Sequence, residues 1–189
     1  MKTKLFAIMA LAIPLAFCSG YVAAESLLNA IFTPLRQKEI VPVDNKQYQD
    51  ECGSCHFAYQ PGLLPAKSWE KLLTPEALSN HFGVNAELDK DTLNLIHDYA
   101  IAKAADKSYH KRSRKIAQST AQVEAPLRIT EVYYIKRKHQ KIPEKMITQN
   151  NDVKSLNYCD ACHTQAAQGV FEADTVNIPH FPDWDNSTF

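Results

Sequence analysis

The sequence lacks a net charge, a second long apolar run and spare cysteines. Its 21 basic and 21 acidic residues balance, so nothing in the overall charge favours a nucleic-acid partner. After the first 17 residues no apolar run is long enough to span a membrane, so we expect a mature protein without a membrane span. All of the five cysteines except Cys18 lie in two short motifs, which leaves no thiols for a disulfide framework.

The two motifs have the form C-x-x-C-H. They are Cys52-Gly53-Ser54-Cys55-His56 and Cys159-Asp160-Ala161-Cys162-His163. Two thiols three positions apart can add to the vinyl groups on one porphyrin edge, and the histidine that follows can then ligate the iron. With 5 Cys and 7 His in 189 residues, chance predicts about 0.005 such matches. The sequence therefore predicts two covalently bound haem c groups, with His56 and His163 as proximal ligands. Zinc knuckles or a thioredoxin-like dithiol are the alternatives.

The first residues predict export. Lys2 and Lys4 precede an apolar run that ends at Phe17, and small residues lead up to Ala24. This pattern indicates a secretory signal peptide over residues 1–24, and export to the periplasm agrees with haem attachment outside the cytoplasm. Cys18 follows a sequence that loosely resembles a lipobox, but the bulky Phe17 argues against lipoprotein anchoring.

The remaining 165 residues suit one or two small, mainly helical domains. We expect Ser68 to cap a helix from Trp69, Thr74 to cap a helix over 75–82 that ends at Gly83, and Asp89 to cap a helix over 90–105. Residues 103–117 are basic and lack periodicity, so they are interpreted as a linker. Residues 130–135 have the composition of a strand, but they could equally begin a helix that runs through His139.

The sixth iron ligand decides between electron transfer and ligand chemistry. Beyond the signal peptide only Met146 is available as a methionine, so at most one haem can be His/Met. Histidines are more plentiful: the candidates are His81, His97, His110, His139 and His180. Each also has a structural interpretation, as a helix-terminal, packing or solvated side chain. The residues alone leave the choice of distal ligands open.

A resemblance to a known family narrows that choice. The stretches that carry it are Glu51–His56, Leu63–Pro65, Ser68–Trp69, His81–Gly83, Asn85–Ala86, Leu88, Ala104–Asp106, Leu127–Thr130, His139, Asn157–His163 and Gly169. Together they resemble the bacterial periplasmic diheme cytochromes c, typified by the electron donor to the small oxygen-binding sphaeroides haem protein. The departures are Tyr133-Tyr134, where a Trp-Phe-like pair is expected, and His180 after Pro179, where glycine is expected.

The resemblance implies bis-histidine haems and two domains. Because the family's pattern has histidines at positions matching His81 and His139, it implies that these are the distal ligands. We pair His81 with His56 and His139 with His163 by sequence proximity; the crossed pairing is the alternative. The implied fold is a small cytochrome c-like helical domain over 25–118 and an irregular domain over 119–189 that wraps the second haem.

The predicted function is single-electron transfer to a periplasmic redox partner. The sequence shows no catalytic triad, no general-base constellation and no output domain for a sensor. The alternative is a diheme peroxidase or nitrogen-oxide reductase, which needs one open haem. The resemblance implies a small oxygen-binding haem protein as acceptor. Basic runs at 107–115 and 136–141 indicate a docking surface for an acidic partner, with solvated charge as the other interpretation.

Overall fold

Helices and irregular segments make up residues 39–184, the part of the chain that the computed structural model describes. The predicted signal peptide over 1–24, with Cys18, lies outside the described residues. Within them the only β pairings are two isolated bridges, His81 with Val84 and His163 with Val176. No helix among residues 39–184 is both long and apolar enough to cross a membrane. The prediction of a mainly helical protein is confirmed.

The described elements are short. The α-helices are α2 (Lys46–Cys52), α3 (Ala66–Leu72), α4 (Pro75–Ser79), α5 (Lys90–Ala102), α6 (Lys111–Thr120), α7 (Tyr133–His139) and α8 (Cys159–Cys162). The 3₁₀ helices are η1 (Pro61–Leu63), η2 (Ala105–Lys107), η3 (Ile129–Glu131), η4 (Glu144–Met146), η5 (Ala166–Gln168) and η6 (Ala173–Thr175).

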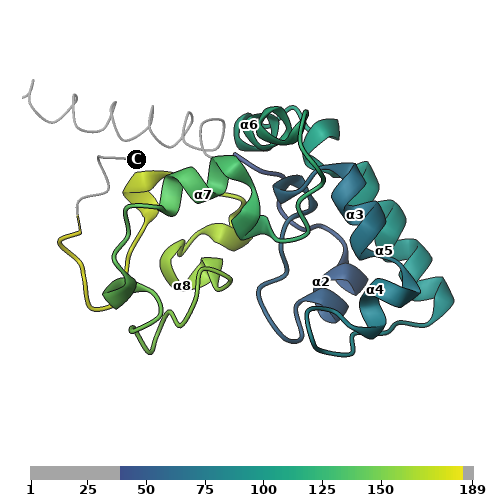
Figure 1. The fold of residues 1–189 in the computed structure, drawn as a ribbon, viewed down its shortest axis with the longest axis horizontal. Helices are drawn as coiled ribbons and strands as arrows, with labels where there is room; N and C mark the ends of the chain where they lie inside the picture. Colours follow the sequence, from purple (N-terminus) through teal and green to yellow (C-terminus); the bar gives the residue numbers. More distant parts are fainter. Residues whose placement is uncertain (1–38, 185–189) are drawn as a thin grey trace, which may run out of the picture. The chain divides into compact units, whose positions relative to one another are not determined.

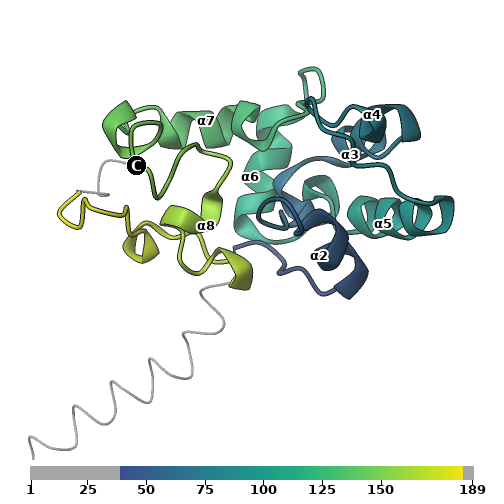
Figure 2. The ribbon, with the colours of Figure 1, turned by 90° about the horizontal axis from the view of Figure 1, so that it is seen from below.

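Helices α2 to α5 lie together, and α7 lies with α8 and the C-terminal 3₁₀ turns (Figures 1 and 2). Helix α6 lies between these groups in both views, and it contacts η1 and η2 of the first group and α7 of the second. The predicted domain boundary at residue 118 falls inside α6. The division into domains over 25–118 and 119–189 stays a prediction.

The first helical group contains much of one apolar core that continues into the second group, and within it α3 packs on α5. Leu93, Ile96 and Ala100 of α5 are buried at helical spacing. They face a cluster that includes Trp69 of α3 and Tyr48 of α2, whose rings make an edge contact. This core fixes the helix that ends at Cys52, and so it fixes where the first motif begins.

The apolar loop after the first motif is held by side-chain hydrogen bonds. The Tyr48 hydroxyl donates to the carbonyl of Tyr59 (2.7 Å), and Trp69 Nε1 donates to the carbonyl of Pro61 (2.8 Å). Residues 60–64 are buried, so the bond from Trp69 satisfies a Pro61 carbonyl that water does not reach. These hydrogen bonds hold the backbone of the loop that follows the first motif.

Two of the predicted helix caps are confirmed. The carboxylate of Asp89 accepts from the N–H groups of Asp91 and Thr92 at the start of α5, and Thr74 Oγ1 accepts from Ala77 at the start of α4. The prediction for Ser68 is wrong: α3 begins at Ala66, and Ser68 is buried inside that helix. Pro65 is the N-cap of α3, with an extended backbone whose φ is fixed by the proline ring.

Three predicted segments differ from the structure, and a fourth, for which strand and helix were both open, is resolved. The helix predicted over 90–105 ends at Ala102. Helix α4 ends at Ser79 rather than continuing to residue 82, and a tight turn then follows. The predicted linker over 103–117 contains η2 and most of α6, because Ile116 and Ser113 give α6 a buried face despite its many charges. Residues 133–139 are helical, so the helical alternative for this segment is the correct one.

Candidate haem-binding sites

The first motif follows directly on α2. Cys52 ends the helix, and His56 lies in the turn beyond it. Nδ1 of His56 donates to the carbonyl of Phe57 (2.8 Å), which leaves the Nε2 lone pair free for a metal. The ring of Tyr59 stacks on the His56 ring at a centroid distance of 4.8 Å. The imidazole is therefore held on one side by a hydrogen bond and on its face by an aromatic ring.

His81 faces His56 from a tight turn after α4. Its N–H donates to the carbonyl of Val84 (2.7 Å), and the turn has positive φ angles at Phe82 and Gly83. The ring centroids of His56 and His81 are 6.5 Å apart, and their planes are 26° from parallel. Burial, and then the nearby His56 and Arg128, lower the pKa of His81 below its usual value, so its imidazole is neutral at pH 7.

The second motif forms α8, and His163 is the residue that caps it. His139 ends α7, where its Nδ1 donates to the carbonyl of Ile135 (2.8 Å) within the last turn of the helix. The ring centroids of His139 and His163 are 6.0 Å apart, and their planes are 74° apart. Burial, and then His139 and Arg112, lower the pKa of His163 to about 3, which keeps this imidazole neutral.

Both ring separations suit one metal ion between two imidazoles. A metal–imidazole bond is about 2 Å long and the ring centre lies about 1 Å behind the nitrogen, so two trans imidazoles have centroids roughly 6 Å apart. The observed values are 6.5 Å and 6.0 Å. Nδ1 of His81 and of His163 is buried without a hydrogen-bond partner. The residues present fit an iron porphyrin at both sites.

An apolar cavity surrounds the second pair. Cys159, Cys162, His139 and His163 all line it. Its walls come from both helical groups; they include Leu63, Ile129, Ile135, Met146, Phe171 and Ile178. A cavity that contains two thiols and two facing imidazoles among apolar walls has the chemistry that a haem c requires.

The first pair is more open to solvent. Phe82, Val84 and Leu127 are exposed apolar side chains, and Arg128 lies over the Phe82 ring with its guanidinium carbon 3.9 Å from the centroid. Arg128 is also one of the groups that lower the pKa of His81. These side chains form an apolar rim with one cation beside the first imidazole pair.

The thiols of the described residues are not part of a zinc-ligand set. Burial raises the pKa of Cys52 and of Cys159 to about 12, so both are neutral at pH 7. None of the four cysteines within residues 39–184 is in a disulfide. The same part of the chain contains no group of three or more His, Cys, Asp or Glu side chains that could bind a metal ion. The zinc interpretation therefore has no ligand set in the described residues.

The other candidate ligands lie elsewhere. His97 pairs with Asp98 on the surface of α5, and His180 pairs with Asp152 (2.6 Å). His110 precedes α6, with its Nδ1 3.4 Å from Ser108 Oγ. Met146 is buried in the wall of the second cavity, where His139 is the side chain that faces His163.

The two motifs lie close to one another. The hydroxyl of Tyr59, whose ring stacks on His56, donates to the carbonyl of Asn157 (2.5 Å), two residues before Cys159. A further cavity is lined by His56 from the first motif and by Asp160 from the second. Tyr59 therefore connects the His56 imidazole of the first motif with the segment that precedes the second motif.

Sequence reasoning missed one residue beside the second cavity. Arg112 was placed in a surface run, but it lines the cavity and forms an ion pair with the buried Glu39. Its partner is 73 positions away, so no local pattern could have indicated the pair.

Comparisons with known proteins identify the family. The sequence matches the dihaem cytochrome c family over residues 48–171. A diheme cytochrome c from Shewanella baltica OS155 is 39% identical and has a TM-score of 0.59, with 74% of this chain and 96% of that chain covered. A diheme cytochrome c from Rhodobacter sphaeroides is 38% identical with a TM-score of 0.60, covering 69% of this chain and 99% of that chain. A comparison with curated proteins gives no match.

Proposed function

This chain belongs to the dihaem cytochrome c family and has two covalently bound c-type haems, and we propose that it transfers single electrons through them to a periplasmic redox partner. The observation that carries the proposal is the pair of facing imidazoles at each site, 6.5 Å and 6.0 Å apart. An iron with two strong axial ligands has no open position for a substrate, and it changes little on reduction.

The haems supply one-electron chemistry, and the chain supplies ligands, orientation and an apolar surround. His56 and His163 serve as proximal ligands, with His81 and His139 as their distal partners. The Nδ1 hydrogen bonds of His56 and His139 to backbone carbonyls support this role, because they orient the rings and increase the basicity of the ligating nitrogens. The bridge from Tyr59 to Asn157 supports electron exchange between the two haems within one molecule.

Low-temperature EPR of the ferric protein tests this function. We expect two low-spin signals, no stoichiometric high-spin signal and no binding of carbon monoxide to the reduced protein. A high-spin signal of one iron per chain would instead favour the diheme peroxidase or nitrogen-oxide reductase alternative.

We also propose that electrons leave through a basic surface on α6 and α7. The exposed cations of this surface are Lys111, Arg114, Lys115, Lys136 and Arg137, and neither helix contains an acidic residue. The two helices are in contact, and α7 ends at His139 beside the second haem site. This surface suits an acidic partner such as a small oxygen-binding haem protein.

Charge reversal tests this surface. Lys111→Glu and Lys136→Glu should each slow electron transfer to an acidic oxygen-binding haem protein several-fold at low salt and flatten its salt dependence. Lys90→Glu on α5 is the control, because it makes the same change in net charge at another exposed position. Equal rates for all three variants would remove the docking proposal and leave the bis-histidine proposal untouched.

A further inference from the structure

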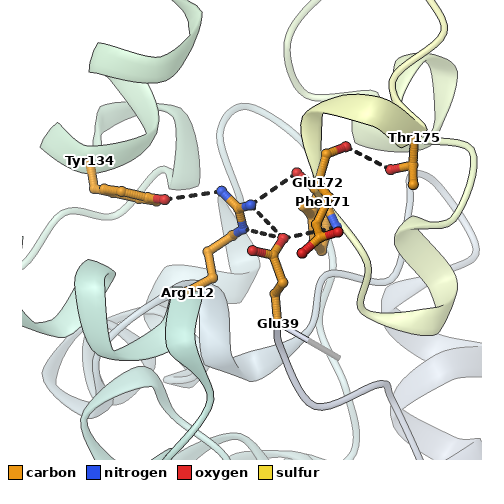
Figure 3. Close-up of polar contacts among 6 residues, drawn as sticks. All are labelled: Glu39, Arg112, Tyr134, Phe171, Glu172 and Thr175. Carbon is orange, nitrogen blue, oxygen red and sulfur yellow. Dashed lines mark hydrogen bonds and ion pairs between the residues drawn. The ribbon is translucent and has the colours of Figure 1, made fainter. Parts of the chain in front are cut away.

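Arg112 joins three separate segments of the chain (Figure 3). Its Nε donates to Glu39 Oε2 (2.9 Å), and its Nη2 donates to the same oxygen and to the carbonyl of Phe171 (3.0 Å). Its Nη1 donates to the hydroxyl of Tyr134 (3.1 Å). Glu39 Oε2 also accepts from the N–H of Phe171 (3.2 Å). The guanidinium and carboxylate therefore form one connected network.

Two of these segments carry or contact the imidazoles of the second haem site. The ring of Phe171 lies 5.2 Å from the ring of His163, centroid to centroid. Tyr134 belongs to α7, the helix that ends at His139. Arg112, Tyr134 and Phe171 all line the cavity that both imidazoles share. The network thus contacts the segments on both sides of the second imidazole pair.

The ion pair is shielded from solvent. The Glu39 side chain is 4% exposed and that of Arg112 is 16% exposed. Charges in such surroundings interact more strongly and are screened less by salt than surface charges. Because Arg112 lines the same cavity as both imidazoles, its charge lies beside the second site.

We propose that the Arg112–Glu39 ion pair sets the reduction potential of the haem attached to Cys159 and Cys162. The proposal rests on the proposed electron-transfer function. It adds which charged groups set the reduction potential of one of the two haems. Reduction adds one electron to the iron, so the cation favours the ferrous state and the carboxylate opposes it. Removing one partner leaves the charge of the other uncompensated. Loss of Glu39 should therefore raise the reduction potential of the second haem, and loss of Arg112 should lower it.

The test is a redox titration of each haem in three variants. Glu39→Gln keeps an oxygen that can accept from Arg112 and Phe171 but removes the negative charge. At a fixed applied potential we expect it to raise the ferrous-to-ferric ratio of the second haem at least about threefold. Arg112→Met should lower that ratio by a similar factor. The double variant should lie between the two.

Two controls separate charge from structure. The first haem of the same molecule should keep its reduction potential. Its signal is the one whose potential changes in the His81→Met variant. The exposed pair Lys71–Glu124 gives matched changes, and Lys71→Met and Glu124→Gln should leave both haems nearly unchanged.

Shifts of the same sign in Glu39→Gln and Arg112→Met would overturn the proposal, as would equal shifts in both haems or none in the second. If Arg112→Met does not fold, the sign of the Glu39→Gln shift decides alone: a rise supports the proposal, and a fall or no change overturns it. Failure of the electron-transfer function would be seen separately, as a high-spin signal in the unmodified protein.

Discussion

At the scale of single residues, the two imidazole pairs differ in the angle between their planes. The planes of His56 and His81 are 26° apart, whereas those of His139 and His163 are 74° apart. Near-parallel planes donate π density into one iron orbital and split the d levels, while near-perpendicular planes donate into two and leave the levels almost degenerate.

We therefore predict two distinct EPR signals from the ferric protein. The first haem should give an ordinary rhombic low-spin signal, and the second a strongly anisotropic one. The Cys159→Ala/Cys162→Ala variant assigns them, because it should lack the anisotropic signal. Two identical rhombic signals would contradict the plane angles.

A methionine in place of a distal histidine is a second test at this scale. His81→Met should keep the first iron six-coordinate and raise its reduction potential, because a thioether stabilises the ferrous state better than imidazole does. The measurement is a potentiometric titration of both haems. His97→Met and His180→Met are matched controls, since these histidines pair with Asp98 and Asp152 at the surface. A change in the second haem instead of the first would mean that the pairs are crossed.

At the scale of elements, Gly169 determines how the arm before α2 meets the C-terminal segment. Gly169 has a φ of 77°, and its carbonyl accepts from the N–H groups of Glu39 and Ile40. A Cβ at this position would lie 2.1 Å from the Ile40 carbonyl oxygen. No L-residue fits there without moving one of the two backbones.

We predict that Gly169→Ala destabilises the protein by roughly 1–3 kcal/mol, through backbone strain and the clash with Ile40. Chemical denaturation measures this cost. Gly83→Ala is an informative comparison, because Gly83 also has a positive φ (99°) but nothing lies within 4 Å of its Cβ position. Gly83→Ala should destabilise the protein less than Gly169→Ala does. Equal destabilisation would show that backbone strain alone, without the clash with Ile40, accounts for both effects.

The contact between α5 and the segment before α2 predicts that the stability of the protein depends on pH. The Tyr99 hydroxyl, and then Lys103, hold the pKa of Asp44 below its usual value of about 3.8. A carboxylate with a depressed folded-state pKa stabilises the fold above its unfolded pKa, and this stabilisation is lost as the pH falls through the folded pKa.

Asp44→Asn should therefore lower the melting temperature slightly at pH 6–7 and have no effect well below pH 3.8. Thermal unfolding of both proteins across this range measures the difference. Because Asp44 is exposed, the effect is small. A difference that persisted unchanged at the lowest pH would exclude this ionic contribution.

At the scale of the whole molecule, we expect the haems to replace part of an ordinary core. The residues around the second cavity form only short helices and 3₁₀ turns, whereas α2 to α5 pack around Tyr48, Trp69 and Ile96. The two groups should therefore depend on their haems to different degrees.

We predict that Cys159→Ala/Cys162→Ala leaves one haem per chain and a folded first group. Limited proteolysis should then cut within residues 129–184 and leave a fragment that contains 46–102. Haem content and mass spectrometry of the fragments measure both outcomes. Cys52→Ala/Cys55→Ala is the reciprocal variant. Loss of all structure in the first variant would show that the chain folds as one cooperative unit and would contradict the predicted domains.

The cofactor chemistry follows from the local sequence, because two thiols and a histidine within five positions suffice to attach a haem c. The local sequence also determined the start of α5, because the Asp89 cap and the apolar stripe are local signals. It was wrong about residues 103–117, where α6 has few apolar residues and is stabilised by burial against other elements.

The contacts between distant side chains depend on how the whole chain packs. The packing of α7 brings His139 to His163, and a turn after α4 brings His81 to His56. The Tyr59–Asn157 bond joins residues 98 positions apart, and the Arg112–Glu39 pair joins residues 73 apart. Such contacts leave no periodic trace in the sequence, since they depend on the free energy of packing the whole chain around its cofactors.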